Sequence, residues 1–299
     1  MPRLRPLTAI AVMAAMGAAL AGCASDAEGD TGIRIVASTS VYGDLAATIG
    51  GDLVSVDSII DDPAKDPHEY QADARTQLAL SKADLVVRNG GGYDDFVDTM
   101  LTASGNDSVP VVDAVELSSF DPAAPDFNEH VWYDYPTVGK VVAAIEARLA
   151  ALDPAHAELF SANADQLQKG VTALEDQVAA ISGHAAGTGV AITEPVPLHL
   201  LQNLGLDNRT PAEFSEAVEN DTDVAPSLLR ETLALFTDGK VALLVFNPQT
   251  GGPQTDAVLA AAKKSGVPAV AADEILPPGY HYLEWQSGLL DDIAGALGV

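Results

Sequence analysis

Histidines stand beside carboxylates at two places in the first half of the chain. One is Asp66-Pro67-His68-Glu69-Tyr70 and the other is Asn128-Glu129-His130-Val131-Trp132. Each lies in a segment rich in Pro and Asp, which is typical of a loop. Imidazole nitrogens and carboxylate oxygens are ligands of Zn²⁺, Mn²⁺ and Fe²⁺ in proteins. A single histidine in a loop is often only a turn residue, but two in comparable loops favour ligands that share one metal ion.

Three acidic residues closely follow predicted strands in the second half of the chain. Glu194 comes after one apolar run, and the neighbours Asp273 and Glu274 come after another. In parallel α/β sheets, ligands bind beyond the carboxyl ends of the strands. Two imidazoles from one lobe and two carboxylates from a second lobe would therefore meet at one place. The predicted metal ligands are His68, His130, Glu194 and one of the pair Asp273 and Glu274.

The other histidines do not share this placement. His156 and His184 are expected at the surface, on or after a long helix, and His281 stands near the chain end. His199 lies five residues after Glu194 on the next predicted helix. It is therefore the strongest additional candidate ligand.

Short apolar runs that alternate with helical patterns predict two α/β lobes, each with a small parallel sheet flanked by helices. Between the lobes, an apolar stripe at steps of four and three residues predicts one long helix from Pro154 to about Ser182. No regular element is expected between Gly205 and Pro226. The predicted strands are 33–37, 53–60, 84–88, 109–112, 190–193, 241–246 and 268–271. The predicted domains are an N-terminal lobe at 33–152, the linking helix at 153–183 and a C-terminal lobe at 184–299.

The first 23 residues have the pattern of a secretory signal. Two arginines precede an uncharged apolar stretch, residues 7–20, and Leu20-Ala21-Gly22-Cys23 closes the segment. This ending resembles a bacterial lipobox, which implies cleavage before Cys23 and lipidation of its thiol. Cys23 is the only cysteine, so the chain has no internal disulfide and no catalytic thiol. Residues 24–32 are small and acidic, as expected of a flexible tether.

The chain is strongly acidic, with a formal net charge of −28. Removal of the signal segment makes the remainder more negative, because that segment carries only the two positive charges. Such a charge argues against binding to nucleic acid or to anionic lipid headgroups, and it attracts cations.

The order of the motifs resembles the metal-binding lipoproteins of ABC importers for zinc and manganese, in the TroA-like periplasmic-binding-protein family. Its most specific parts are Asp66-Pro67-His68 and His130-Val131-Trp132. The family's third ligand stands eleven residues before a Gly-Leu pair, and counting back from Gly205-Leu206 leads to Glu194. The resemblance covers the whole mature chain. It implies two lobes joined by a backbone helix, with one ion in the cleft between them.

The resemblance leaves the metal and the fourth ligand open. A glutamate at the third position resembles the manganese-type members, while zinc has the higher intrinsic affinity at such sites. The segment Leu117 to Glu129 lacks the histidines that many zinc-type members carry there. The expected ion is therefore Zn²⁺ or Mn²⁺, with Fe²⁺ also compatible. Alignment with the family's Asp-Ser-Ile places the fourth ligand at Asp273, whereas alignment with its Leu-Pro-Gly type of ending places it at Glu274, the slightly favoured choice.

The function implied is that of a solute-binding lipoprotein at the extracytoplasmic face of a bacterial cell membrane. It would be a monomer and not an enzyme, and it would deliver its ion to the permease of an ABC importer. A secreted metallohydrolase is one alternative, although His-Glu-x-x-His, Gly-x-Ser-x-Gly and phosphate-loop motifs are absent. A metal-stabilised surface adhesin is the other.

Overall fold

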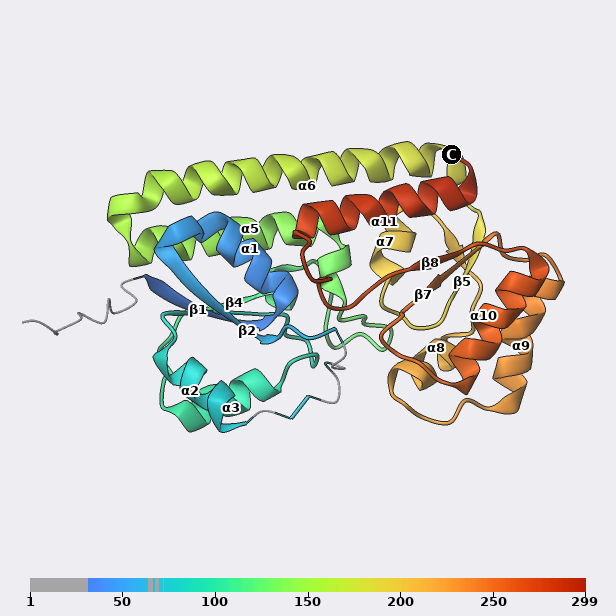
Figure 1. Ribbon diagram of the computed structural model, residues 1–299, viewed down its shortest axis with the longest axis horizontal. Helices are drawn as coiled ribbons and strands as arrows, with labels where there is room; N and C mark the ends of the chain where they lie inside the picture. The colour runs from blue at the N-terminus through green and yellow to red at the C-terminus, as the bar shows by residue number, and fades with distance from the viewer. Residues whose placement is uncertain (1–31, 64–66, 68–69, 72) are drawn as a thin grey trace, which may run out of the picture. The chain divides into compact units, whose positions relative to one another are not determined.

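Two four-stranded parallel sheets, each flanked by helices, are the main elements of the computed structural model (Figure 1). The structure describes residues 32–63, 67, 70–71 and 73–299. The first sheet contains β1 (Ile33–Thr39), β2 (Val54–Ile60), β3 (Leu85–Arg88) and β4 (Val111–Asp113). The second contains β5 (Gly189–Ile192), β6 (Asp207–Asn208), β7 (Leu243–Phe246) and β8 (Ala269–Ala271). The predicted fold class is confirmed.

Helices connect successive strands and cover the sheets. In the first half they are α1 (Ser40–Gly50), α2 (Ala74–Lys82), α3 (Phe96–Ser104), α4 (Ala114–Leu117) and α5 (Tyr135–Leu152). In the second half they are α7 (Leu198–Asn203), α8 (Ala212–Glu219), α9 (Pro226–Thr237), α10 (Pro253–Ser265) and α11 (Tyr282–Leu297). The short 3₁₀ turns are η1 (Gly51–Leu53), η2 (Val131–Tyr133) and η3 (Pro154–His156), and the long helix between the halves is α6 (Ala157–Ala185).

Both sheets have the same topology. The strand order is β2-β1-β3-β4 in the first and β6-β5-β7-β8 in the second, and all neighbours are parallel. In each sheet the order reverses beside the first strand in sequence, which opens a crevice at the carboxyl ends of the central strands. The central strands are continuous apolar runs, such as Leu243-Leu244-Val245, because both of their faces are buried.

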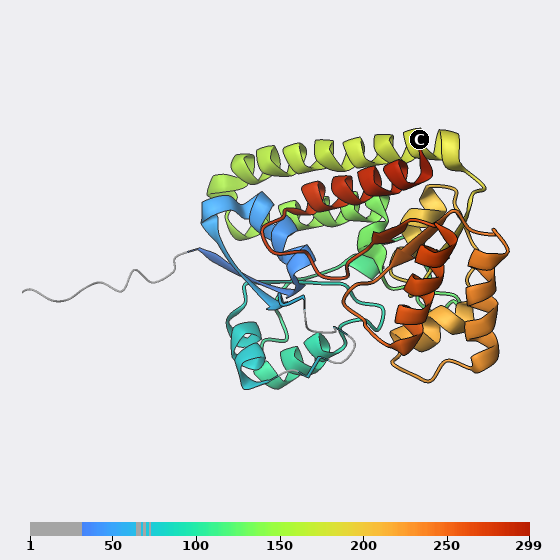
Figure 2. The same cartoon turned by 45° about the vertical axis from the view of Figure 1, so that its right-hand side comes forward.

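The long helix α6 packs along both halves of the described chain. Its apolar stripe, which includes Leu167, Val171 and Leu174, is buried. The stripe belongs to one apolar cluster that also contains Ile35 of the first sheet and Val245 of the second. Figures 1 and 2 show α6 running beside α5 and α11, which it contacts. The predicted helix is therefore present and anchors both sheets through one shared core.

Two elements lie where the sequence predicted irregular structure. The helix α8 occupies much of the acidic stretch after Pro211, and the two-residue strand β6 pairs with β5 through Asn208. The expectation of irregular structure was wrong because burial of Phe214 and Val218, four residues apart, stabilises a helix that is only eight residues long.

The N-terminal predictions lie outside the described residues. These are the signal segment at 1–23, the lipidated Cys23 and the tether apart from Gly32. Residues 32–299 group into one compact unit, so the predicted boundaries at 152 and 183 stay predictions. Among the described residues, no helix has both the length and the apolar character needed to cross a bilayer.

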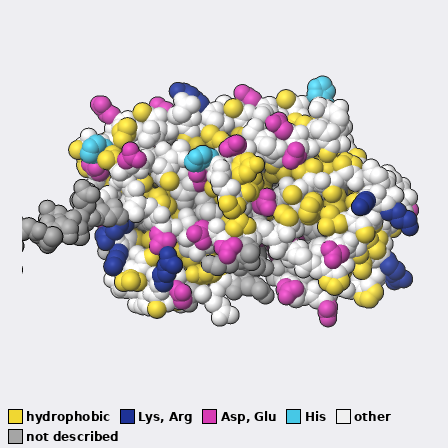
Figure 3. All heavy atoms as spheres, viewed as in Figure 1, with side chains coloured by type: hydrophobic (Ala, Val, Ile, Leu, Met, Phe, Trp, Pro, Cys, Tyr) yellow, Lys and Arg dark blue, Asp and Glu magenta, His cyan; other side chains and the backbone are white. Residues whose placement is uncertain are grey.

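The acidic composition is visible at the surface. On the face shown in Figure 3, Asp and Glu side chains are scattered over the whole view, including its middle, while Lys and Arg side chains lie mainly toward the two ends. A cation that approaches this middle region therefore meets mainly negative charge.

Candidate metal centre

The buried imidazole of His130 is held in a fixed orientation. The residue directly precedes η2, and its side chain is completely buried. Its Nδ1 lies 2.6 Å from Asn128 Oδ1, so Nδ1–H donates to the amide oxygen. The amide nitrogen of Asn128 in turn donates to the carbonyl of Pro195, at 3.1 Å. This leaves Nε2 of His130 as the nitrogen that is available to a metal ion.

Two carboxylates face that nitrogen. His130 Nε2 lies 3.3 Å from Glu274 Oε1 and 3.5 Å from Glu219 Oε1. Burial lowers the pKa of His130, but the hydrogen bond with Glu274 and the negative charges of Glu219 and Glu274 raise it by more. The imidazole therefore binds its second proton more readily than a free histidine, and a metal ion must displace that proton.

Glu194 is buried beside the same group of side chains. It directly follows Thr193 at the end of β5, and only 2% of its surface is exposed. Asn247 Nδ2 donates to Glu194 Oε2 at 2.7 Å and to Glu274 Oε2 at 3.3 Å. One amide thus joins the two predicted carboxylates. Within the described part of the chain, the other oxygen of Glu194, Oε1, is buried without a hydrogen-bond partner.

Burial dominates the electrostatics of Glu194. Burial is the largest cause that raises the pKa of the carboxyl to about 7. The hydrogen bond from Asn247 lowers this pKa, and the negative charge of Glu274 raises it further. A buried carboxylate that lacks full hydrogen bonding is costly unless a cation compensates it. The orphaned oxygen and the raised pKa both fit a site that is designed for a positive ligand.

The structure places Glu274, and not Asp273, beside His130. The side chain of Glu274 is 3% exposed, and its backbone N–H donates to Gln249 Oε1 at 2.6 Å. Asp273 instead contributes its backbone carbonyl, which accepts a hydrogen bond from Tyr133 Oη at 2.6 Å. Burial raises the pKa of the Asp273 carboxyl.

The fourth predicted ligand, His68, lies outside the described residues. The residues that precede its loop reach the site, because Gln249 Nε2 donates to the carbonyl of Pro63 at 2.8 Å while Gln249 Oε1 accepts from Glu274. Among the described residues alone, no group of three or more His, Cys, Asp or Glu side chains is arranged to hold a metal ion. The described candidate ligands therefore do not form such a group by themselves.

The remaining histidines lie elsewhere. His199 is buried, but its Nε2 hydrogen-bonds to the backbone carbonyl of Asn128 at 2.8 Å and its ring stacks on Phe120. Burial lowers the pKa of His199. His156 and His281 are at the surface, paired with Asp153 and Asp44 respectively. His199 thus supports the segment that carries His130 rather than joining the ligands.

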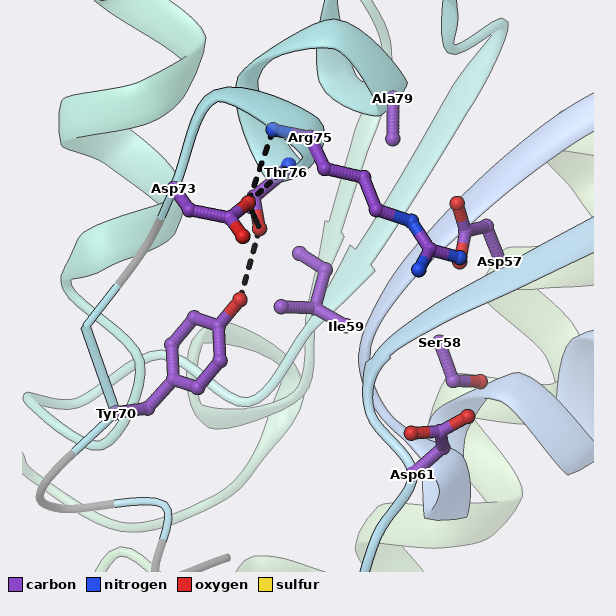
Figure 4. Close-up of a pocket in the computed structure, with 9 residues that line it drawn as sticks. All are labelled: Asp57, Ser58, Ile59, Asp61, Tyr70, Asp73, Arg75, Thr76 and Ala79. Carbon is purple, nitrogen blue, oxygen red and sulfur yellow. Dashed lines mark hydrogen bonds between the residues drawn. The ribbon is translucent and has the colours of Figure 1, made fainter.

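Two of the cavities in the described part of the chain differ in their relation to the site. A pocket of about 150 Å³ lies in the first lobe (Figure 4), where Tyr70 Oη and Thr76 Oγ1 are 2.8 Å apart and Asp73 caps α2. Its described lining residues include none of the predicted ligands. A larger cavity of about 450 Å³ is lined by Asn128, Glu129 and Glu219, and it therefore borders the His130 site.

The sequence did not predict a role at the site for three residues that contact the predicted ligands. Asn128 and Asn247 orient or join ligands, and Glu219 adds a carboxylate. Asn128 stands only two residues before His130, a spacing that suits an amide hydrogen bond to the ring. Asn247 directly follows the strand β7, so its position at a strand end could have indicated it, whereas Glu219 had no such signal.

We expect Asn128→Ala to lower divalent-metal affinity by about 10–100-fold, because an orienting partner of a ligating imidazole is lost. Competition titration of Mn²⁺ against a chelating dye measures the effect. The control is Asn220→Ala, which removes an exposed amide that lines the same cavity. Equal affinities in the two variants would refute the orienting role of Asn128.

The fold and the site together define a class: the helix-linked solute-binding proteins, in which a ligand is held between two parallel α/β lobes. Residues 35–296 match the family described as zinc-uptake complex component A, periplasmic. The chain therefore belongs to this family.

Several known proteins are similar to this chain. The manganese-binding lipoprotein MntA of Bacillus subtilis (strain 168) is 26% identical over 256 residues, which are 83% of this chain and 82% of that protein. The protein of the same name from Halalkalibacterium halodurans is 33% identical over 171 residues, 56% of this chain and 54% of that one.

Solved structures share the fold. The solute-binding protein FpvC of Pseudomonas aeruginosa, in complex with Mn²⁺, superposes with a TM-score of 0.74 at 25% identity, covering 89% of this chain and 98% of that one. The periplasmic zinc-binding protein TroA of Treponema pallidum has a TM-score of 0.70 at 19% identity, covering 89% and 99%. This second likeness concerns the fold alone.

Proposed function

We propose that this protein captures one divalent transition-metal ion, Zn²⁺ or Mn²⁺, and delivers it to the permease of an ABC importer. The observation that supports this most directly is the buried Nε2 of His130, which faces a carboxylate of the other lobe at 3.3 Å. The proposed ligands are His130, Glu194 and Glu274, with His68 as the fourth. Glu274 is preferred over Asp273 because its side chain, and not that of Asp273, lies beside the imidazole.

The donor set fits these ions. Imidazole and carboxylate suit Zn²⁺, Mn²⁺ and Fe²⁺. The only cysteine, Cys23, is the proposed site of lipidation, so no thiolate is available to favour a soft metal. The acidic surface raises the local cation concentration, and the buried ligands exclude water. Membership of the family supports the role as a transport receptor, and the names of similar manganese-binding lipoproteins support the cargo.

The proposed location is the extracytoplasmic face of the cell membrane, with Cys23 as the site of lipidation. The lipobox-like ending of the signal segment and the lipoprotein names of similar proteins support this. The proposed partners are the permease and, through the anchor, the membrane. The receptor is proposed to act as a monomer.

Elemental analysis of protein purified without chelator tests the site. The wild-type chain should carry about one transition-metal ion, as expected for a single set of ligands. His68→Ala and Glu194→Ala should both lose it. Retention of stoichiometric metal by both variants would rule out the proposed ligands.

Metal removal separates a transport receptor from a protein that needs metal to fold. The shared apolar core includes residues of both sheets and of α6, so we expect chelator-treated protein to unfold cooperatively. Mn²⁺ at about 100 times its Kd should add about 2.7 kcal/mol of stability, measured by thermal unfolding. A chelated protein without a cooperative transition would instead support the metal-stabilised adhesin. Hydrolase assays on the metal-loaded protein test the enzyme alternative, and sustained turnover would favour it.

A further inference from the structure

Glu219 carries a mostly buried carboxylate that neither the motifs nor the family resemblance assigned. It is the last residue of α8, and its side chain is only 11% exposed. A glutamate at a helix end normally extends into water. Here Phe214 and Val218 are buried in an apolar cluster of the second lobe, so the packing of α8 fixes the position from which Glu219 projects.

The two pairwise distances from His130 Nε2 are in the range found between two ligand atoms of one ion, although the described side chains do not form a ready-made set of three ligands. Glu219 Oε1 and Glu274 Oε1 lie 3.5 and 3.3 Å from the same nitrogen. With metal–nitrogen and metal–oxygen bonds of about 2.1 Å, two adjacent ligand atoms are separated by about 3.0 Å at an angle of about 90° and by about 3.4 Å at the tetrahedral angle. Glu219 therefore stands as close to the available imidazole nitrogen as a ligand would, and nearly as close as Glu274.

A second observation ties the same group to a cation. Glu194 is 2% exposed, and its Oε1 is buried without a hydrogen-bond partner among the described residues. Asn247 Nδ2 donates to both Glu194 and Glu274, and the carboxyls of Glu274 and Glu219 both lie beside His130 Nε2. Three mostly buried carboxyls thus share one region, and a bound cation would offset their mutual repulsion.

The cavity next to the site gives Glu219 a connection to solvent. Asp126 and Glu129 line this cavity from one side, and Glu216 and Glu219 line it from α8. Its described lining residues include no Lys, Arg or His. Glu216 and Asp126 are exposed, whereas Glu219 is the member that also contacts His130. The acidic lining therefore leads from the surface to the candidate ligands.

We infer that Glu219 is a further carboxylate ligand of the captured ion, at the point where the acidic cavity meets the His130 site. This inference rests on the proposed metal-binding function. It gives the site three carboxylates instead of two, and a site rich in carboxylate oxygen is better suited to Mn²⁺ than one built from imidazoles.

Titration of the full chain with MnCl₂ tests this ligand, with Glu219→Gln as the variant and Glu216→Gln as its matched control. Both substitutions remove one carboxylate from α8 and from the same cavity. We expect Glu219→Gln to lower Mn²⁺ affinity at least about tenfold, as loss of a group at a metal site does. Glu216→Gln should change it by less than about twofold, as expected of an exposed charge in a high dielectric.

The absorption spectrum of the Co²⁺-loaded protein separates a ligand from a distant charge. It should differ from that of the wild type in Glu219→Gln and stay the same in Glu216→Gln, because only loss of a ligand changes the coordination sphere. The inference would be overturned if Glu219→Gln bound Mn²⁺ as tightly as Glu216→Gln does. It would also be overturned if the Co²⁺ spectrum of Glu219→Gln equalled that of the wild type. If the wild-type chain itself binds neither ion, the proposed function fails instead.

Discussion

Glu194→Gln is expected to lower the affinity for Mn²⁺ or Zn²⁺ by more than about 100-fold, the upper end of what loss of an orienting group causes. The substitution keeps the shape of the side chain, and its carbonyl oxygen can still accept the hydrogen bond from Asn247. It removes a negative charge in a buried place, where water cannot replace it. The loss should therefore come from the ligand itself and not from damage to the fold. Isothermal titration at pH 7.5 measures it.

The same variant should be more stable than the wild type in the absence of metal. The pKa of Glu194 is about 7 in the folded protein, whereas its ordinary value is 4.5. Above pH 4.5 the carboxyl ionises more readily in the unfolded chain than in the folded one, and this difference lowers the free energy of unfolding. At pH 8 this cost reaches up to about 3 kcal/mol, and it is absent below pH 4.5. Urea unfolding of chelated Glu194→Gln at pH 8 should therefore give a higher midpoint than the wild type.

Asp273→Asn is the matched control and also tests the choice between the neighbouring acids. It removes a carboxylate next to Glu274 but leaves the backbone carbonyl that accepts from Tyr133. We expect it to retain metal affinity within about threefold, well below the loss that removal of a group at a metal site causes, because Glu194 and Glu274 keep their shared hydrogen bonds from Asn247. Glu274→Gln should lose as much metal affinity as Glu194→Gln. Wild-type affinity in Glu194→Gln would contradict the site, and a large loss in Asp273→Asn would move the fourth ligand to that residue.

The large-scale fold could be predicted because its signals are local and repeated. The buried strands β3 and β7 are continuous apolar runs, and α6 has an uninterrupted stripe of buried residues that extends over several turns. Each pattern is typical of one type of element only. The helix α8 was missed because it is short and its two main apolar residues stand among acids, so its stability depends on contacts with distant parts of the chain.

The candidate site was predictable only as far as strand ends could indicate it. Glu194 and the pair Asp273 and Glu274 follow strands, and the topology of parallel sheets then predicts that they face a common crevice. Glu219 lies at the end of a helix and has no such signal. Which neighbour of the acidic pair faces the imidazole depends on hydrogen bonds with Gln249 and Tyr133, which are set by tertiary structure.

Metal affinity is expected to fall at least about 50-fold between pH 7.5 and pH 5. An ion needs a deprotonated carboxylate at Glu194, whose pKa is about 7, and a neutral imidazole at His130, whose pKa is raised by the adjacent carboxylates although burial opposes the rise. Below these pKa values each group must release a proton when the ion binds, and each released proton lowers the affinity about tenfold per pH unit. Mn²⁺ titrations in buffers of different ionisation enthalpy also count the protons released.

The stability of the chelated protein should change with pH in the opposite direction. Both groups have raised pKa values in the folded state, so they contribute stability that is present at low pH. The contribution of Glu194 is lost as pH rises from 4.5 through about 7, and that of His130 is lost above 6.5. Over this range, acidification therefore raises the contribution of these two groups to the stability of the chelated protein, and it weakens metal binding. Mild acid should thus release the ion from a receptor that stays folded. Glu194→Gln should make both the metal affinity and the stability of the chelated protein depend less on pH. Equal wild-type affinity at pH 5 and pH 7.5 would show that these groups do not compete with the ion for protons, and it would exclude them as ligands.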